Sequence, residues 1–252
     1  MSPSSTISVE IVVESVASAR AAERGGAARL ELCSSLIEGG ITPATGLIEL
    51  TRAAVSIGIY VMIRPRGGDF CYDHDEFEVM QRDIAVAKRL GADGVVFGIL
   101  DLRGGIDVAR TKRLVELARP LGVTFHRAFD MTPDLPQALE DLCACGLDRV
   151  LTSGGEQTAP QASAVIAQLV QKSRNRIAIM PGSGIKPENA RALVEQTGVK
   201  EIHAGLRSSL PSPLLYRNPR ISMGAAEGLE YQRFGVLEEN VRKLCSAVAN
   251  LG

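Results

Sequence analysis

Short apolar segments alternate with longer amphipathic segments along the whole chain. The apolar segments are four to seven residues long and are predicted to be strands, at Ile7–Val13, Arg29–Cys33, Ile59–Arg64, Gly94–Gly98, Val123–His126, Arg149–Thr152, Arg176–Met180 and Lys200–His203. The intervening segments have the spacing of helices, as shown after the third strand by Phe77, Met80, Ile84, Ala87 and Leu90. The last helix is expected over Val236–Val248.

This alternation repeats eight times in 252 residues, which predicts a (β/α)8 TIM-like barrel forming a single domain over 1–252. Proline is expected at the first position of several helices, at Pro43, Pro133 and Pro187, where its missing N–H costs nothing. The alternative is an open doubly wound sheet, which usually has a Gly-rich turn after its first strand. Here Glu14-Ser15-Val16 follows that strand, so the barrel is favoured.

The connection over about 205–234 is much longer than an ordinary loop between a strand and a helix. It contains Pro211, Pro213 and Pro219 among many small residues. We expect it to serve as a lid, a subunit contact or both, and a homo-oligomer, either dimer or tetramer, is the expected assembly.

The charge balance excludes some classes of partner. The net charge is −1, from 28 basic and 29 acidic residues, so we expect no nucleic-acid or anionic-membrane partner. No apolar run reaches the roughly 18 residues that span a bilayer, and the first residues have no leader pattern, so a cytoplasmic protein is expected. Five cysteines without a disulfide pattern are typical of a reducing compartment.

Polar side chains near the ends of the predicted strands form the candidate catalytic site. In a barrel the chemistry lies at the carboxyl ends of the strands, and alternation places Glu10, Glu31 and His126 toward the interior there. A polar side chain inside a barrel is costly unless it is paired or used, so we predict these three as candidate acid–base residues. The alternatives are a buried ion pair of either glutamate with Arg64, and a structural histidine.

The segment after the third strand is the first candidate for binding an anion. Arg64 and Arg66 come directly after apolar residues, and Pro65 holds Arg64 in extended geometry. Gly67-Gly68 lets the backbone approach a ligand closely, and Asp69 follows. The alternative is a solvated turn with two surface arginines.

A second candidate is the Gly-rich turn after the seventh strand, which contains Gly182, Ser183 and Gly184 and leads into a helix. Such turns hold phosphate through backbone N–H groups in many barrels, although a tight turn alone also needs glycine. Ser153 follows the neighbouring strand and adds a hydroxyl donor. Two further residues complete the predicted substrate-binding set, Arg127 and His203.

Several long motifs resemble the CutC family of copper homeostasis proteins. They are Glu31–Ser34 with Glu38-Gly39-Gly40, Met62–Phe70, Thr124–Met131 and Arg149–Gly154. The resemblance covers nearly the whole chain. It implies a TIM-like barrel, a cytoplasmic location, and an association with copper tolerance and Cu(I) binding.

The resemblance places the proposed copper-ligating cysteine at Cys33. Members with a two-cysteine site carry the second cysteine where this chain has Val12, which cannot bind a metal. Cu(I) prefers soft sulfur ligands, so Cys33 would need a second ligand that the sequence does not identify. Three hypotheses follow: Cu(I) handling through Cys33, an enzyme performing acid–base chemistry on a small anionic or phosphorylated metabolite, and a scaffold that only offers a partner surface.

Overall fold

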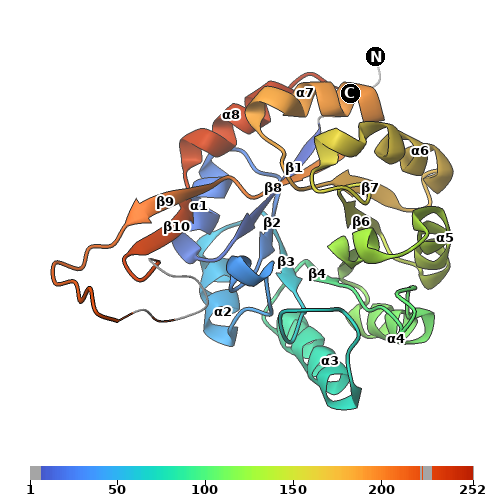
Figure 1. The fold of residues 1–252 in the computed structure, drawn as a ribbon, viewed down its shortest axis with the longest axis horizontal. Coiled ribbons are helices and arrows are strands. Elements are labelled where there is room, and N and C mark those ends of the chain that lie inside the picture. Colours follow the sequence, from blue (N-terminus) through green and yellow to red (C-terminus); the bar gives the residue numbers. More distant parts are fainter. Residues whose placement is uncertain (1–6, 222, 224–228, 252) are drawn as a thin grey trace.

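The protein forms a nearly closed barrel of eight parallel strands surrounded by helices (Figure 1). The structure is a computed structural model that describes residues 7–221, 223 and 229–251. The strands pair in the order β7-β6-β5-β4-β3-β2-β1-β8, and β7 and β8 lie next to each other where the barrel closes. Their bounds are β1 Ser8–Val13, β2 Arg29–Leu32, β3 Gly58–Met62, β4 Gly94–Phe97, β5 Gly122–Phe125, β6 Arg149–Thr152, β7 Ala178–Pro181 and β8 Glu201–Ala204. The predicted barrel is confirmed, and every predicted strand overlaps an observed one.

Eight α-helices cover the outside of the barrel in the part of the chain that is described: α1 Val16–Arg24, α2 Thr45–Ala54, α3 His74–Arg89, α4 Val108–Ala118, α5 Leu135–Cys145, α6 Ser163–Ser173, α7 Pro187–Thr197 and α8 Glu238–Val248. The described loops contain three short 3-10 helices: η1 Leu36–Glu38, η2 Arg127–Met131 and η3 Ala159–Ala162. Pro187 opens α7 as predicted. The same prediction was wrong for Pro43 and Pro133, which lie two residues before α2 and α5, because the chain first turns into each helix.

A layer of charged side chains lies inside the barrel toward the amino ends of the strands, where Arg29, Arg149 and Glu201 are the first residues of β2, β6 and β8. Glu201 accepts hydrogen bonds from both Arg29 and Arg149, and the two guanidinium groups lie 5.2 and 5.3 Å from the centre of the Tyr60 ring. The ring occupies space that only glycine leaves free, because a Cβ at Gly94 would lie 2.2 Å from a carbon of this ring. This packed layer closes the barrel from below and supports the residues at the mouth.

The long connection after β8 contains a hairpin that extends away from the barrel (Figure 1). Strand β9, Arg207–Pro211, pairs antiparallel with β10, Gln232–Val236. The long connection predicted over about 205–234 thus contains two strands, while 222 and 224–228 lie outside the described residues. Between these strands, the side chains of Leu214, Leu215 and Tyr216 are exposed to solvent. None of the helices in the described residues has the length and apolar character needed to cross a membrane.

Candidate functional site

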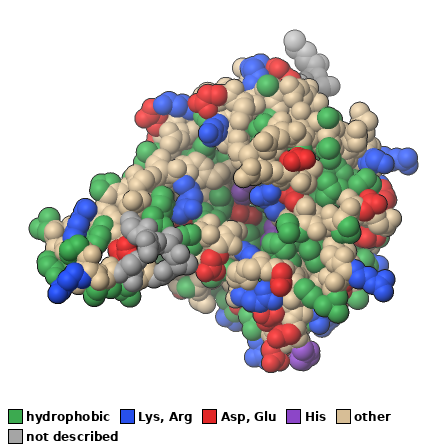
Figure 2. Space-filling view, in the orientation of Figure 1, with side chains coloured by type: hydrophobic (Ala, Val, Ile, Leu, Met, Phe, Trp, Pro, Cys, Tyr) green, Lys and Arg blue, Asp and Glu red, His purple; other side chains and the backbone are tan. Residues whose placement is uncertain are grey.

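A pocket of about 300 Å³ lies at the carboxyl ends of the strands. Figure 2 looks into this mouth and shows histidine and acidic side chains at the bottom of a hollow. The pocket is lined by Val12, Glu31, Leu36, Glu38, Gly39, Met62, Arg64, Phe70, His126, Arg127, Asp130, Met131, Leu151 and His203. Strand alternation thus brings Glu31, His126 and His203 to one place, and each of the three is buried.

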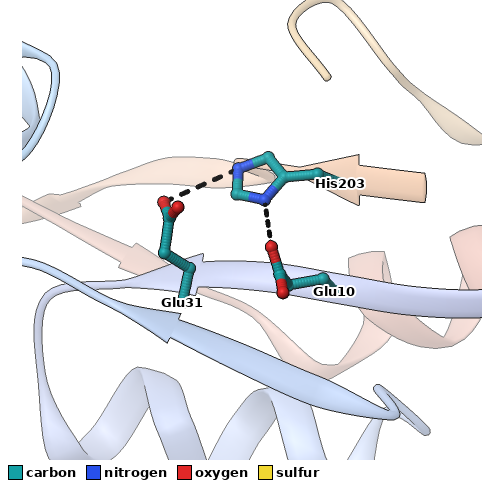
Figure 3. A group of neighbouring side chains, drawn as sticks. All are labelled: Glu10, Glu31 and His203. Carbon is teal, nitrogen blue, oxygen red and sulfur yellow. Dashed lines mark hydrogen bonds and ion pairs between the residues drawn. The ribbon is translucent and has the colours of Figure 1, made fainter. Parts of the chain in front are cut away.

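His203 lies between two glutamates, as Figure 3 shows. Its Nδ1 is 2.8 Å from Oε1 of Glu10, and its Nε2 is 3.9 Å from Oε2 of Glu31. Glu10 also accepts a hydrogen bond from Arg29, so both of its carboxylate oxygens are in use. Glu10 does not line the pocket; it lies behind His203 and holds the imidazole in place.

The charges of this group shift its pKa values in different directions. Burial favours the neutral form of Glu10, but the hydrogen bond from His203 and the charge of Arg29 outweigh it and lower the pKa of Glu10 to about 2. Burial raises the pKa of Glu31, against the opposing effect of His203. Burial disfavours the charged form of His203, but Glu31 and Glu10 outweigh it and raise its pKa. Glu31 is therefore the carboxyl group of this trio that protonates more readily.

Glu31 has one oxygen without a hydrogen-bond partner among the described residues. Its Oε2 accepts a hydrogen bond from the thiol of Cys33 at 3.5 Å, whereas Oε1 is buried and unpaired. An unpaired buried polar atom costs roughly 1–3 kcal/mol, so a ligand donor that reaches Oε1 would remove that cost.

His126 is held as a neutral ring. The backbone N–H of Ala128 donates to its Nδ1 at 3.1 Å, so the proton of the neutral imidazole is on Nε2. Burial, and then the charge of Arg64, lower the pKa of His126 to about 3. Nε2 is buried and has no partner within the described chain. His126 therefore carries an unused N–H donor and is one of the residues that line the pocket.

Arg64 lines the pocket, and two of its three guanidinium nitrogens are bound to the protein backbone, while Nε is buried and has no hydrogen-bond partner among the described residues. Nη1 donates to the carbonyl oxygens of Glu38 and Gly40 at 2.7 and 3.0 Å, and Nη2 donates to that of Gly68 at 2.9 Å. Its positive charge also lies over the Phe70 ring, 5.0 Å from the ring centre. Arg64 thus fixes two loops around the pocket, and it pairs with neither Glu10 nor Glu31, so that alternative is wrong.

The other two residues predicted beside Arg64 lie away from the pocket. Arg66 forms an ion pair with Glu76 and a second with Asp69, which is exposed. Neither Arg66 nor Asp69 lines the pocket. The solvated-turn alternative describes these two residues better than anion binding, and their substrate-binding role stays a prediction.

Arg127 is the half-exposed cation at the rim of the pocket. Its Nε donates to Asp130 at 2.8 Å and its Nη2 donates to the Ser153 hydroxyl at 2.6 Å, while Nη1 has no hydrogen bond to the residues described. Asp130 also accepts from the Ser153 backbone N–H at 2.9 Å. Ser153 therefore positions Arg127 and lies outside the pocket lining.

The Gly-rich turn after β7 does not form part of this pocket. The Ser183 hydroxyl donates to the carbonyl oxygen of Gln157 at 2.9 Å, and Gly184 lines a separate depression with Lys186 and Arg207. Ser183 and Gly184 both have left-handed backbone angles, with φ of 74° and 71°. Gly182 packs against His203 and Leu151, where a Cβ would lie 2.6 Å from a Leu151 methyl group. Phosphate binding by this turn stays a prediction.

Sequence reasoning missed several lining residues. Met62 alternates with Tyr60 in β3 and with Arg64 two residues after the strand, so the same alternation rule identifies it. Phe70 packs against His126 with 4.9 Å between ring centres, and no sequence pattern indicates that contact.

Comparison of the sequence and the fold with known proteins shows the family of this chain. A family model described as the CutC family matches residues 7–208. A mouse relative named copper homeostasis protein cutC homolog is 47% identical over 94% of this chain and 86% of its own length. A Chromobacterium violaceum protein named family protein CutC is 44% identical over 95% and 97% of the two chains. The chain belongs to the CutC family. The solved structure of CutC from Streptococcus agalactiae has a TM-score of 0.76 and 34% identity, covering 79% of this chain and 98% of that one.

In this CutC family member, Cys33 lies next to the pocket and does not line it. Its side chain is fully buried in a small cluster with Val12, Met62 and Val96. Burial, together with the charge of Glu31, raises the pKa of the Cys33 thiol well above its usual value. A soft metal ion would therefore have to displace the thiol proton, and Met62 is a second soft sulfur in the same cluster.

Glu10, Glu31 and His203 form a group in this CutC protein whose potential ligand atoms lie within 4.8 Å of one another. Carboxylate and imidazole ligands suit hard or borderline cations better than Cu(I). Because both oxygens of Glu10 are occupied, a cation here would be left with Glu31 and Nε2 of His203 as protein ligands. The donor set therefore fits a resident divalent ion poorly.

Proposed function

We propose that this protein acts in copper homeostasis and that its ligand binds at the barrel mouth. The observation that carries this proposal is its close similarity, over nearly the whole chain, to the mouse protein named copper homeostasis protein cutC homolog. The first candidate ligand is Cu(I). In this proposal Cu(I) is cargo that Cys33 binds together with a second soft ligand.

The side chains around Cys33 support this form of the proposal. Cys33 and Met62 supply a thiol and a thioether within one buried cluster, and both are softer ligands than Glu31. Val12 belongs to the same cluster, so a cysteine at position 12 would add a second thiol near the first. We therefore expect native binding to be weaker than that of a two-thiolate site.

Cu(I) binding can be measured by titrating the reduced protein against a competing chelator. The native protein and a Cys71→Ala control are expected to bind one Cu(I), and Cys33→Ala and Cys33→Ser to lose that site. Val12→Cys should tighten binding. Equal affinity of the native protein and Cys33→Ser would contradict Cu(I) binding through Cys33.

A second candidate function is acid–base chemistry on a small anionic or phosphorylated metabolite. The specific observation that favours it is that a carboxylate acceptor, Oε1 of Glu31, and a neutral donor, Nε2 of His126, are buried without partners in the described part of the chain, on residues that line one pocket. Arg127 adds a positive charge at the rim. In this proposal Glu31 is the base, with Glu10 and His203 positioning it, and His126 is the hydrogen-bond donor.

Binding of an anion can be tested with inorganic phosphate and glycolate as probes. Either probe should shift the ring nitrogen NMR signals of His126 in the native protein. Arg127→Gln should lower the affinity for the probe about tenfold or more, which is the loss expected for one charged hydrogen bond. Arg176→Gln, which alters an exposed arginine far from the mouth, is the control. Unchanged His126 signals at saturating concentrations of both probes would rule out this second function.

We also propose a cytoplasmic location and a homo-oligomer that uses the hairpin of β9 and β10. The exposed side chains of Leu214, Leu215 and Tyr216 support a contact between subunits, because contiguous apolar surface of this kind is typical of interfaces. Sedimentation of the native protein tests the oligomer, and a purely monomeric species at 100-micromolar concentration, on the order of the weakest stable dimers, would contradict it.

A further inference from the structure

The imidazole ring of His126 is held in one orientation, with its Nε2–H as a hydrogen-bond donor. The Ala128 N–H holds its Nδ1, the Phe70 ring packs on it, and Gly98 leaves no spare room, because a Cβ there would lie 2.5 Å from two ring atoms of His126. The ring is therefore fixed in orientation and tautomer before any ligand binds. A donor that needs no reorganisation stabilises charge that develops on a ligand oxygen during a reaction.

Glu31 supplies the complementary group on the same pocket. Its Oε1 lacks a partner among the residues that the structure describes, while Oε2 is held by the Cys33 thiol, so one oxygen is left for a ligand hydrogen. The pocket joins this acceptor, the His126 donor and the rim cation Arg127. A carboxylate base, a neutral imidazole donor and an arginine are together suited to a compound with a C–H bond, a carbonyl oxygen and an anionic group.

We propose that the pocket takes an anionic carbonyl compound and catalyses proton transfer at the carbon next to its carbonyl group. This inference rests on the second proposed function and names its substrate class. A volume of about 300 Å³ suits a compound of the size of a keto acid or a triose phosphate.

The proposed step is balanced within the pocket. The Glu31 carboxylate takes the proton, the electron pair of the C–H bond forms a C=C bond, and the carbonyl π pair moves to the oxygen. The resulting enolate oxygen accepts the hydrogen bond from Nε2 of His126. Return of the proton to the same carbon restores the substrate. In a compound with a hydroxyl group on that carbon, return of the proton to the former carbonyl carbon gives an isomer, provided that the hydroxyl proton passes to the enolate oxygen, so neither outcome needs an oxidant or other co-reactant.

Hydrogen–deuterium exchange in D2O tests the step with pyruvate and dihydroxyacetone phosphate as probes, followed by proton NMR. We expect the native protein to exchange the protons next to the carbonyl group of at least one probe. Glu31→Gln should slow this exchange about 10²-fold or more, and His126→Phe should have an effect of similar size. Lactate, which is anionic but has no carbonyl group beside its methyl group, should not exchange.

Two controls keep the result clear. Glu140→Gln changes an exposed carboxylate that pairs with Arg176 outside the pocket, and it should exchange at the native rate. Glu31→Asp keeps the charge with a shorter reach, so partial exchange by this variant separates loss of the base from loss of the fold.

The outcomes separate this inference from the function on which it rests. If phosphate or glycolate shifts the His126 signals but neither carbonyl probe exchanges faster than with Glu31→Gln, the pocket binds anions and the proton-transfer proposal is overturned. If neither shift nor exchange occurs, both fail.

Discussion

Replacing Glu10 by glutamine should destabilise the protein strongly although the two side chains have nearly the same size. Glu10 is fully buried, lies 2.8 Å from Nδ1 of His203 and accepts a hydrogen bond from Arg29. Glutamine removes the negative charge and leaves both cations facing a neutral amide. Removing one partner of a buried ion pair typically costs about 3–5 kcal/mol, which is a large part of a total stability of about 5–15 kcal/mol.

Urea denaturation followed by far-UV circular dichroism measures this loss. The matched control is Glu140→Gln, which removes a carboxylate from an exposed pair with Arg176 and should cost less than about 1 kcal/mol. The low pKa of Glu10, about 2, gives a stability contribution that is complete above its ordinary value of 4.5 and is lost as the pH falls toward 2. The difference between native and Glu10→Gln should therefore shrink below pH 4.5. Equal losses for the two variants at pH 7 would refute the reasoning.

Three further predictions concern His126, the glycine beside it and the hairpin. The pKa of His126 is lowered from 6.5 to about 3, so its neutral form adds stability that is complete above pH 6.5 and lost as the pH falls. In urea titrations between pH 6.5 and about 3, the native protein should lose up to about 1.4 kcal/mol of unfolding free energy per pH unit more than His126→Asn. If the unfolding free energies of the two proteins fall in parallel with pH, this prediction is wrong. Gly98→Ala should displace the His126 ring and destabilise the protein. Gly46→Ala, at a position in α2 where a Cβ meets open space, should stabilise it by about 0.5–1 kcal/mol. Thermal unfolding of the two variants and the native protein measures both changes in stability. Leu215→Glu, at a fully exposed position, should leave stability unchanged and weaken self-association in sedimentation experiments, and unchanged association would argue against the hairpin as a contact.

Strand alternation predicted which side chains face the mouth because it is a property of the extended backbone. It placed Glu31 and His126 together although they lie far apart in the sequence, whereas Glu10, which it also placed there, lies behind His203 and outside the pocket lining. The eight strands were predictable from a different pattern, because each is a short apolar run between helical segments. The hairpin was not, because β9 and β10 are short, half-exposed and separated by a long segment that contains Pro213 and Pro219.

The partners of the buried charges could not be predicted from the sequence. Glu10 pairs with Arg29, which comes from the lower part of β2, and not with Arg64. An arginine side chain is long enough to reach several neighbours, so strand parity alone does not select its partner. The carbonyl groups that hold Arg64 belong to loops whose course depends on packing, and no residue pattern encodes it.

The central claim is that one pocket holds a neutral, donating His126 and a charged His203 beside Glu31. Ring-nitrogen NMR of protein labelled with ¹⁵N-histidine tests it directly, because the chain has 3 histidines and His74→Gln identifies the signal of the exposed one. We predict that His126 stays neutral with its proton on Nε2 from pH 8 to about 4, and that His203 is protonated at pH 6.5. A His126 ring that gains a second proton near pH 6.5, or one with its single proton on Nδ1, would contradict this account.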